Sequence, residues 1–171
     1  GLSVASMIRV GNQKGLQNYK ELRRIAFSIF LLGTLLATFF ALLFFIFHKN
    51  LPNIYLDVED AVNYSDTSEV LSIASNLLLA AAFFQISDSI QVVVLGALRG
   101  LQDVKIPTIL TFISYWVVGF PISYFLGKEE MYGSFGIWLG LLAGLTTASI
   151  LLFIRFNSLT LKLIKQKHEL T

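Results

Sequence analysis

Asp88 is the residue in this sequence with the clearest capacity for chemistry. It is the one ionisable side chain in the apolar run from Val70 to Leu98. A carboxylate near the centre of a bilayer costs several kcal/mol on insertion scales, so an acid kept there usually lies on a transport pathway or in a binding site. The alternative is a carboxyl group whose hydrogen bonds are satisfied by a neighbouring helix, with no role in transport.

Three neighbours of Asp88 extend this hypothesis. Gln85 and Gln91 lie three residues to either side, on roughly the same helix face, and Phe84 lies one turn earlier. A polar stripe beside an aromatic ring suits a cavity for cationic, partly apolar ligands, which would bind through charge pairing and cation–π contact. The same carboxylate could bind a proton or Na+ in competition with that ligand. For the two glutamines, contact between helices is at least as good an explanation, and Phe84 is more simply a packing residue.

Two further sets of residues stand out in the later apolar runs. Tyr115 and Trp116 lie too deep in the third run for an interfacial aromatic belt. They either line a cavity or fill it, and filling is the simpler explanation. Gly136, Gly140 and Gly144 repeat every four residues, which predicts a face for close contact between helices.

The elements that position these residues are predicted to be membrane-spanning helices. The chain has 171 residues, of which 55% are hydrophobic and 14% charged, against about 25% charged in soluble domains. Continuous apolar runs of this length predict helices that cross the bilayer. We therefore expect an all-α membrane protein, with spans at 25–47, 70–98, 107–126 and 133–154. Pro107 suits the first turn of the third span, whereas Pro121 should kink that span or end it early.

The basic residues predict the direction of the spans. Eleven of the thirteen lysines and arginines fall in residues 1–24, in the connection 99–105 or in the tail from Arg155. The positive-inside rule makes these segments cytoplasmic, so the C-terminus is expected on the cytoplasmic side of the cytoplasmic (inner) membrane. Arg9 and Arg99 are most simply determinants of this topology, and binding of lipid head groups is the alternative.

Several function classes find no support in the sequence. The chain has no cysteine, and neither of its two histidines has a partner at metal-ligand spacing. It lacks a glycine-rich phosphate loop, an HExxH motif and a GxSxG motif, and a nucleic-acid role would need a basic aromatic surface. We therefore expect no enzyme activity, no cofactor and no nucleic-acid partner. The short apolar stretch 1–8 is expected to be the end of a helix in a longer protein.

Four stretches resemble motifs of the multidrug and toxic compound extrusion (MATE) family of transporters. The first resembles the family's R-V-G-N segment, the second its F-Q-x-x-D motif followed by G-x-L-R-G-x-x-D-x-x-x-P, and the others its last two helices. In order, they are Arg9-Val10-Gly11-Asn12 with Gly15; Phe84 to Asp88 with Gly96 to Pro107; Ser114 to Pro121; and Gly136 to Gly140. Within them the resemblance assigns structural roles to Arg9, Gly11, Arg99, Gly100, Pro107, Pro121, Gly136, Gly140 and, one repeat further on, Gly144.

The resemblance implies a fold and a function. Family members have twelve helices in two lobes, so residues 1–171 would form the distal part of the C-terminal lobe: the end of helix eight, then helices nine to twelve. Members export cationic drugs and toxic organic compounds in exchange for Na+ or protons. The implied partners are such cations, the lipid bilayer and the N-terminal lobe of the same polypeptide.

The resemblance also assigns a role to Asp88. It would be the cation-coupling acid of helix ten in the branch named after norfloxacin export. In that branch a tyrosine one turn earlier can join the sodium site, but Phe84 stands there and supplies no oxygen ligand, which leaves proton coupling open. Two other functions stay open, a flippase for lipids or lipid-linked oligosaccharides and a non-transporting membrane subunit that anchors partners.

Overall fold

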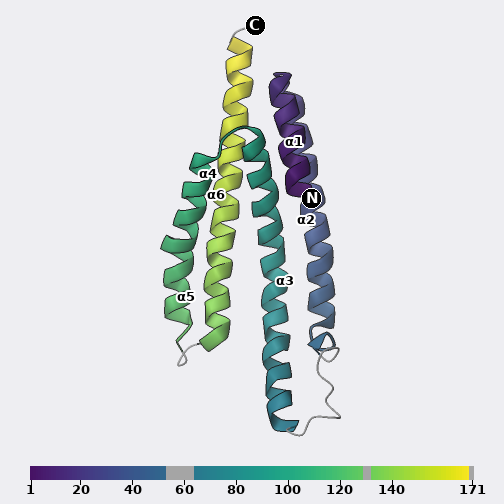
Figure 1. Cartoon of the computed structure of the whole chain (residues 1–171), viewed down its shortest axis with the longest axis vertical. Helices are drawn as coiled ribbons and strands as arrows, with labels where there is room; N and C mark the ends of the chain where they lie inside the picture. Colours follow the sequence, from purple (N-terminus) through teal and green to yellow (C-terminus); the bar gives the residue numbers. More distant parts are fainter. Residues whose placement is uncertain (53–63, 129–131, 170–171) are drawn as a thin grey trace.

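A computed structural model describes residues 1–52, 64–128 and 132–169, and the regular structure in these ranges is helical throughout (Figure 1). Its elements are α1 (Leu2–Gly15), α2 (Tyr19–Phe47), α3 (Tyr64–Gly100), α4 (Lys105–Ile113), the π-helix η2 (Ser114–Gly119), α5 (Phe120–Leu126) and α6 (Gly133–Glu169). Four helical segments are long and apolar enough to cross a membrane: Tyr19–Phe47, Val70–Gly100, Lys105–Leu126 and Gly133–Glu169. The predicted all-α fold with four spans is confirmed.

The observed helices are longer than the predicted spans. Helix α2 begins at Tyr19 rather than Ile25, because Asn18 caps it by accepting a hydrogen bond from the backbone N–H of Glu21. Helix α6 continues to Glu169, well beyond Ile154. Hydropathy marks the part of a helix that lies in lipid. Lysine, arginine and glutamate have high helix propensity, so a helix that contains them can extend into water. The helices therefore extend beyond the segments that hydropathy predicts to lie in lipid.

Pro121 does not end the third span early, because the helical path continues past it to Leu126. Proline has no N–H, and its ring clashes with the carbonyl four residues earlier in an α-helix. Here the six residues of η2 widen the helix just before Pro121, and the N–H of Phe120 bonds to the carbonyl of Tyr115, five residues back. The helical path continues through α5, with a register that differs by one residue from that of an uninterrupted α-helix.

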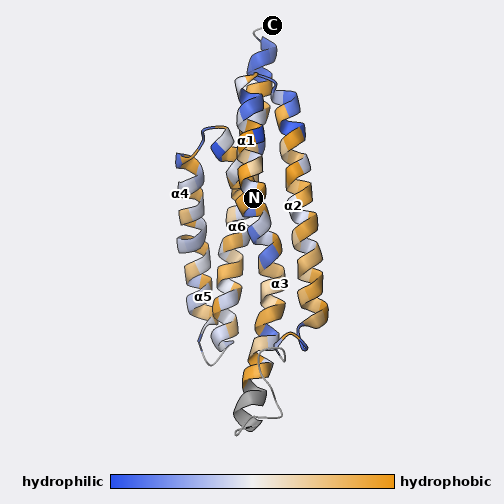
Figure 2. Ribbon diagram, turned by 45° about the vertical axis from the view of Figure 1, so that its right-hand side comes forward, coloured by the Kyte–Doolittle hydropathy of each residue, from blue (hydrophilic) through white to orange (hydrophobic). Residues whose placement is uncertain are grey.

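Helix α3 lies at the centre of the arrangement. It packs against α1, α2 and α6, whereas α4, η2 and α5 pack against α6 (Figure 1). The buried core lies where α1, α2, α3 and α6 meet, and includes Val10, Leu22, Val94, Leu98 and Phe156. The middle of the bundle is strongly hydrophobic, as expected for spans in lipid (Figure 2).

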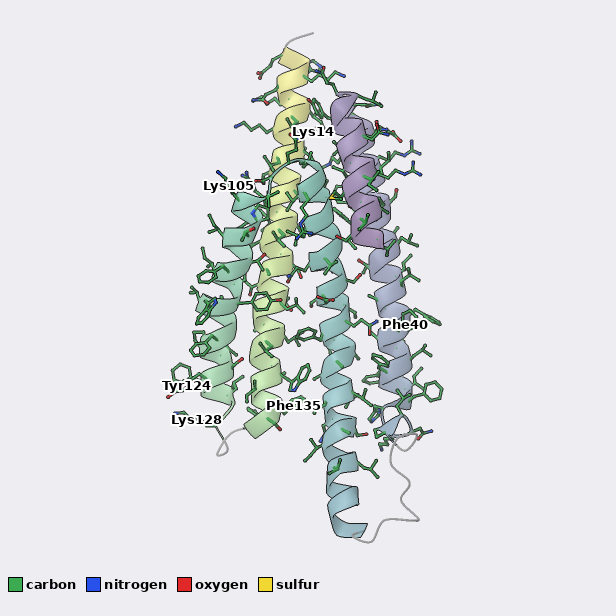
Figure 3. All side chains as sticks on the ribbon, viewed as in Figure 1. Lys14, Phe40, Lys105, Tyr124, Lys128 and Phe135 are labelled. Carbon is green, nitrogen blue, oxygen red and sulfur yellow. The ribbon has the colours of Figure 1, made fainter. Side chains whose placement is uncertain are left out.

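The antiparallel order of the helices brings the basic segments to one end. The end of α1, the start of α2, the α3–α4 connection and the end of α6 lie together at the end marked C (Figure 1), and Figure 2 shows hydrophilic residues gathered there. Lys14 and Lys105 lie toward this end, whereas Tyr124 and Lys128 lie toward the other (Figure 3). The folded chain therefore has one strongly basic end.

Candidate cation-binding site

Hydrogen bonds made by the neighbours of Asp88 fix its depth in the bundle. The hydroxyl of Ser89 donates to the carbonyl of Gly33 on α2 at 3.0 Å, and the hydroxyls of Ser87 and Thr146 on α6 lie 3.1 Å apart. Gly33 and Thr146 both lie inside the apolar runs of their helices. Asp88 is therefore level with the middle of two neighbouring spans.

The carboxylate of Asp88 is open rather than sealed. The residue is exposed, and within residues 1–52, 64–128 and 132–169 it makes no hydrogen bond or ion pair. The contacts to α2 and α6 are made by Ser89 and Ser87, which point to other sides of α3. The described structure thus does not provide the satisfied interhelical hydrogen bond that was the alternative for this acid.

Gln91 and Tyr115 come together next to Asp88. The hydroxyl of Tyr115 donates to the Oε1 atom of Gln91 at 3.2 Å, and Gln91 lies one turn from Asp88 along α3. The Asp88 carboxylate also interacts electrostatically with Tyr115. One amide and one phenol, from α3 and η2, therefore form a polar contact one turn from Asp88.

Phe84 and Gln85 are not joined to this group by any polar contact. The ring of Phe84 packs edge-on against Trp138 of α6, with ring centroids 5.9 Å apart. Gln85 is partly exposed and makes no hydrogen bond to another described residue. Phe84 therefore contributes to the contact between α3 and α6 near Asp88, and the structure gives Gln85 no partner there.

Trp116 belongs to an aromatic stripe on the other side of Tyr115. Its ring lies between those of Phe112 and Phe120, at centroid distances of 5.8 and 5.7 Å, and is 58% exposed. It lines a hollow of about 400 Å³ between η2–α5 and α6, together with Tyr115, Phe120, Ser123, Tyr124, Ile137 and Leu141. Tyr115 thus contributes its ring to this hollow and its hydroxyl to Gln91.

The glycines of α6 allow the span that carries Tyr115 to pack closely against α6. A Cβ atom on Gly136 would meet the carbonyl of Leu126, and one on Gly140 would meet the backbone of Ser123. A Cβ on Gly144 would lie 3.0 Å from the Cα of Gly119. The backbones of η2 and α5 therefore lie directly on the glycine face of α6.

A second glycine contact joins α1 to α3. A Cβ atom on Gly100 would lie 2.5 Å from the carbonyl oxygen of Met7, and one on Gly96 would meet the carbonyl of Ser3. Gly11 of α1 faces the backbone of Gly100. Gly11, Gly96 and Gly100 thus lie where these two helices cross.

The remaining predicted structural residues lie at the basic end. Arg9 and Arg99 are exposed, and Pro107 is buried in the first turn of α4. Sequence reasoning did not single out the ion pair between Asp103 and Arg155, whose Oδ2 and Nε atoms are 2.8 Å apart. Asp103 belongs to a quoted motif and Arg155 follows the fourth apolar run, but their pairing depends on how the helices pack.

Lys14 was also missed as a structural residue. Its ammonium group donates to the carbonyl of Leu101 at 2.7 Å and to the side-chain oxygen of Gln102 at 3.0 Å. Both acceptors follow the last turn of α3, where a cation also interacts favourably with the helix dipole. Among the described residues, no group of three or more His, Cys, Asp and Glu side chains could hold a metal ion.

Together these features define an α-helical integral membrane protein with an exposed carboxylate at the depth of its spans. The chain belongs to the MatE family, whose model matches residues 1–125. It is 37% identical over 158 residues to the multidrug resistance protein MdtK of Proteus mirabilis and 39% identical over 158 residues to the multidrug resistance protein NorM of Aliivibrio fischeri, each match covering 90% of the chain. It is also 37% identical over 161 residues, 94% of the chain, to a probable multidrug resistance protein NorM of Rhodopseudomonas palustris. The chain spans about a third of the length of these relatives.

Proposed function

We propose that this chain is the distal part of the second lobe of a cation-coupled antiporter that exports cationic organic compounds. In this role Asp88 alternately binds the coupling cation and the substrate, so that each displaces the other. The observation that carries the proposal is the carboxylate of Asp88, which is exposed and free of protein partners among the described residues at mid-depth in four apolar spans. A membrane acid in that state has its binding capacity available for a mobile cation.

The relatives support the class of substrate. Those named above are multidrug resistance proteins, and the groups around Asp88 suit organic cations in particular. A carboxylate supplies the charge, the Tyr115 hydroxyl and Gln91 amide supply hydrogen bonds, and the nearby hollow supplies aromatic faces. In this proposal the basic end of the bundle faces the cytoplasm, because eleven of the thirteen basic residues lie in segments that meet there.

The test is replacement of Asp88 in the full-length protein that carries this segment. Asp88→Asn keeps the size of the side chain and removes its charge, so we expect loss of resistance to cationic dyes in an efflux-deficient host, at unchanged protein abundance. Glu169→Gln is the matched control, because it removes an exposed carboxylate at the end of α6. Undiminished export by the Asp88→Asn protein would refute the role of Asp88.

The coupling ion is decided by a separate measurement. Purified protein in liposomes is given either a Na+ gradient or a proton gradient, and uptake or release of a fluorescent cationic dye is followed. Phe84 offers no oxygen one turn from Asp88, which favours the proton as the coupling ion in our proposal. Flux that follows the Na+ gradient alone would contradict this part, and flux of a lipid instead of the dye would indicate a flippase.

A further inference from the structure

The hydrogen bond between Tyr115 and Gln91 is a link between two spans that pack on different sides of α6. Tyr115 lies on η2 and Gln91 on α3, and their Oη and Oε1 atoms are 3.2 Å apart. Helix α3 packs against α6, and so does η2, but α3 and η2 are not neighbours along the bundle (Figure 1). The phenol therefore has to pass α6 to reach its acceptor.

Two features of the sequence allow Tyr115 to do this. The Cδ1 atom of its ring would lie 3.3 Å from a Cβ on Gly144, so the ring passes over a position where α6 has no side chain. Tyr115 also lies in the π-helical turn that precedes Pro121. An extra residue in that turn rotates the preceding part of the span relative to α5, by about 100° for one residue of an α-helix.

The direction of the hydrogen bond fixes the amide of Gln91. A phenol that donates must meet the amide oxygen, so the amide NH2 is left to point elsewhere. Among the described residues that NH2 has no partner. Asp88 lies one turn away on the same face of α3, within the spacing at which glutamine and aspartate side chains interact along a helix.

We propose that Tyr115 is a positioning residue for the cation-binding acid, and this inference rests on the function proposed above. By holding the amide oxygen of Gln91, Tyr115 leaves the amide NH2 free to turn toward Asp88 and to orient its carboxylate. Carboxylates that bind cations are commonly held by hydrogen bonds from such outer partners. Without the Tyr115 hydroxyl, the amide is free to rotate by 180° and to present its oxygen instead.

The experiment uses the full-length protein in liposomes and measures the initial rate of dye transport against the concentration of the coupling cation. Tyr115→Phe should raise the half-saturating cation concentration about three- to tenfold, a larger change than any change in the maximal rate. Gln91→Leu should have the same effect, and the double variant should show no further increase, because both changes remove one link. Tyr132→Phe is the matched control, since it removes a phenol oxygen from a ring that is 58% exposed and does not line the hollow.

Five results would overturn the inference. One is an unchanged half-saturating concentration in Tyr115→Phe. A lower concentration would show that the freed Gln91 oxygen binds the cation. A fall in maximal rate or abundance alone, or additive effects of the two changes, would mean that the residues act only in packing. Absence of cation-dependent flux in the unsubstituted protein would remove the proposed function itself and this inference with it.

Discussion

Replacement of Gly140 by alanine tests whether the glycine face of α6 holds the third span in place. The added Cβ atom would lie 2.5 Å from the Cα of Ser123 and closer still to the backbone nitrogen of that residue. Ordinary contacts begin at about 3.4 Å, so α5 must move away by about 1 Å. Backbone cannot rotate aside as a flexible side chain would, and the shift therefore has to be made by the whole helix.

The expected cost follows from two contributions. Overpacking of a well-packed contact costs about 1–3 kcal/mol. The hydroxyl of Ser123 donates to the carbonyl of Ile137 at 3.1 Å, and an interhelical hydrogen bond in a membrane contributes about 0.6 kcal/mol on average. We expect Gly140→Ala to lower the free energy of unfolding by roughly 2–4 kcal/mol.

The assay is thermal unfolding of the full-length protein in detergent, followed by the fraction that remains monodisperse after heating. Gly140→Ala should unfold several degrees below the unsubstituted protein. Gly15→Ala is the control, because nothing lies within 4 Å of a Cβ at that position. Equal stability of the Gly140→Ala and Gly15→Ala proteins would refute the close contact of α5 with α6.

Two further predictions test the packing around α6. Asp103→Asn should lower the free energy of unfolding by up to about 3–5 kcal/mol, because it leaves Arg155 without its partner in a partly buried ion pair. When Arg155→Gln is added to Asp103→Asn, the further loss of stability should be smaller than the loss that Arg155→Gln causes in the unsubstituted protein. Additive losses in thermal unfolding would show that the pair is not coupled. Because the chain has no cysteine, Ser87→Cys with Thr146→Cys can test the register of α3 against α6. These hydroxyls are 3.1 Å apart, so the two cysteines should cross-link under mild oxidation, whereas Ser87→Cys with Thr147→Cys should not; the reverse order would mean that α6 is rotated.

The sequence by itself determined the class of the protein and the main elements of its fold. A long uncharged run crosses lipid as a helix, because each backbone N–H and C=O must be hydrogen-bonded within the segment. The number of spans follows from this constraint. Basic residues in alternate segments predict an antiparallel order of the spans, and the folded chain has this order. The ends of the helices do not follow from hydropathy, since lipid acts only on their middle parts.

The tertiary structure decided which polar residues meet. Gln85 and Gln91 are equally spaced from Asp88 in the sequence, yet only Gln91 has a partner among the described residues, Tyr115. That contact depends on the π-helical turn before Pro121, because one extra residue changes the direction of every side chain before it. Spacing along a helix gives the face on which a residue lies, but a contact between helices depends on the rotation and separation of both. Those quantities are set by packing along the whole length of the spans.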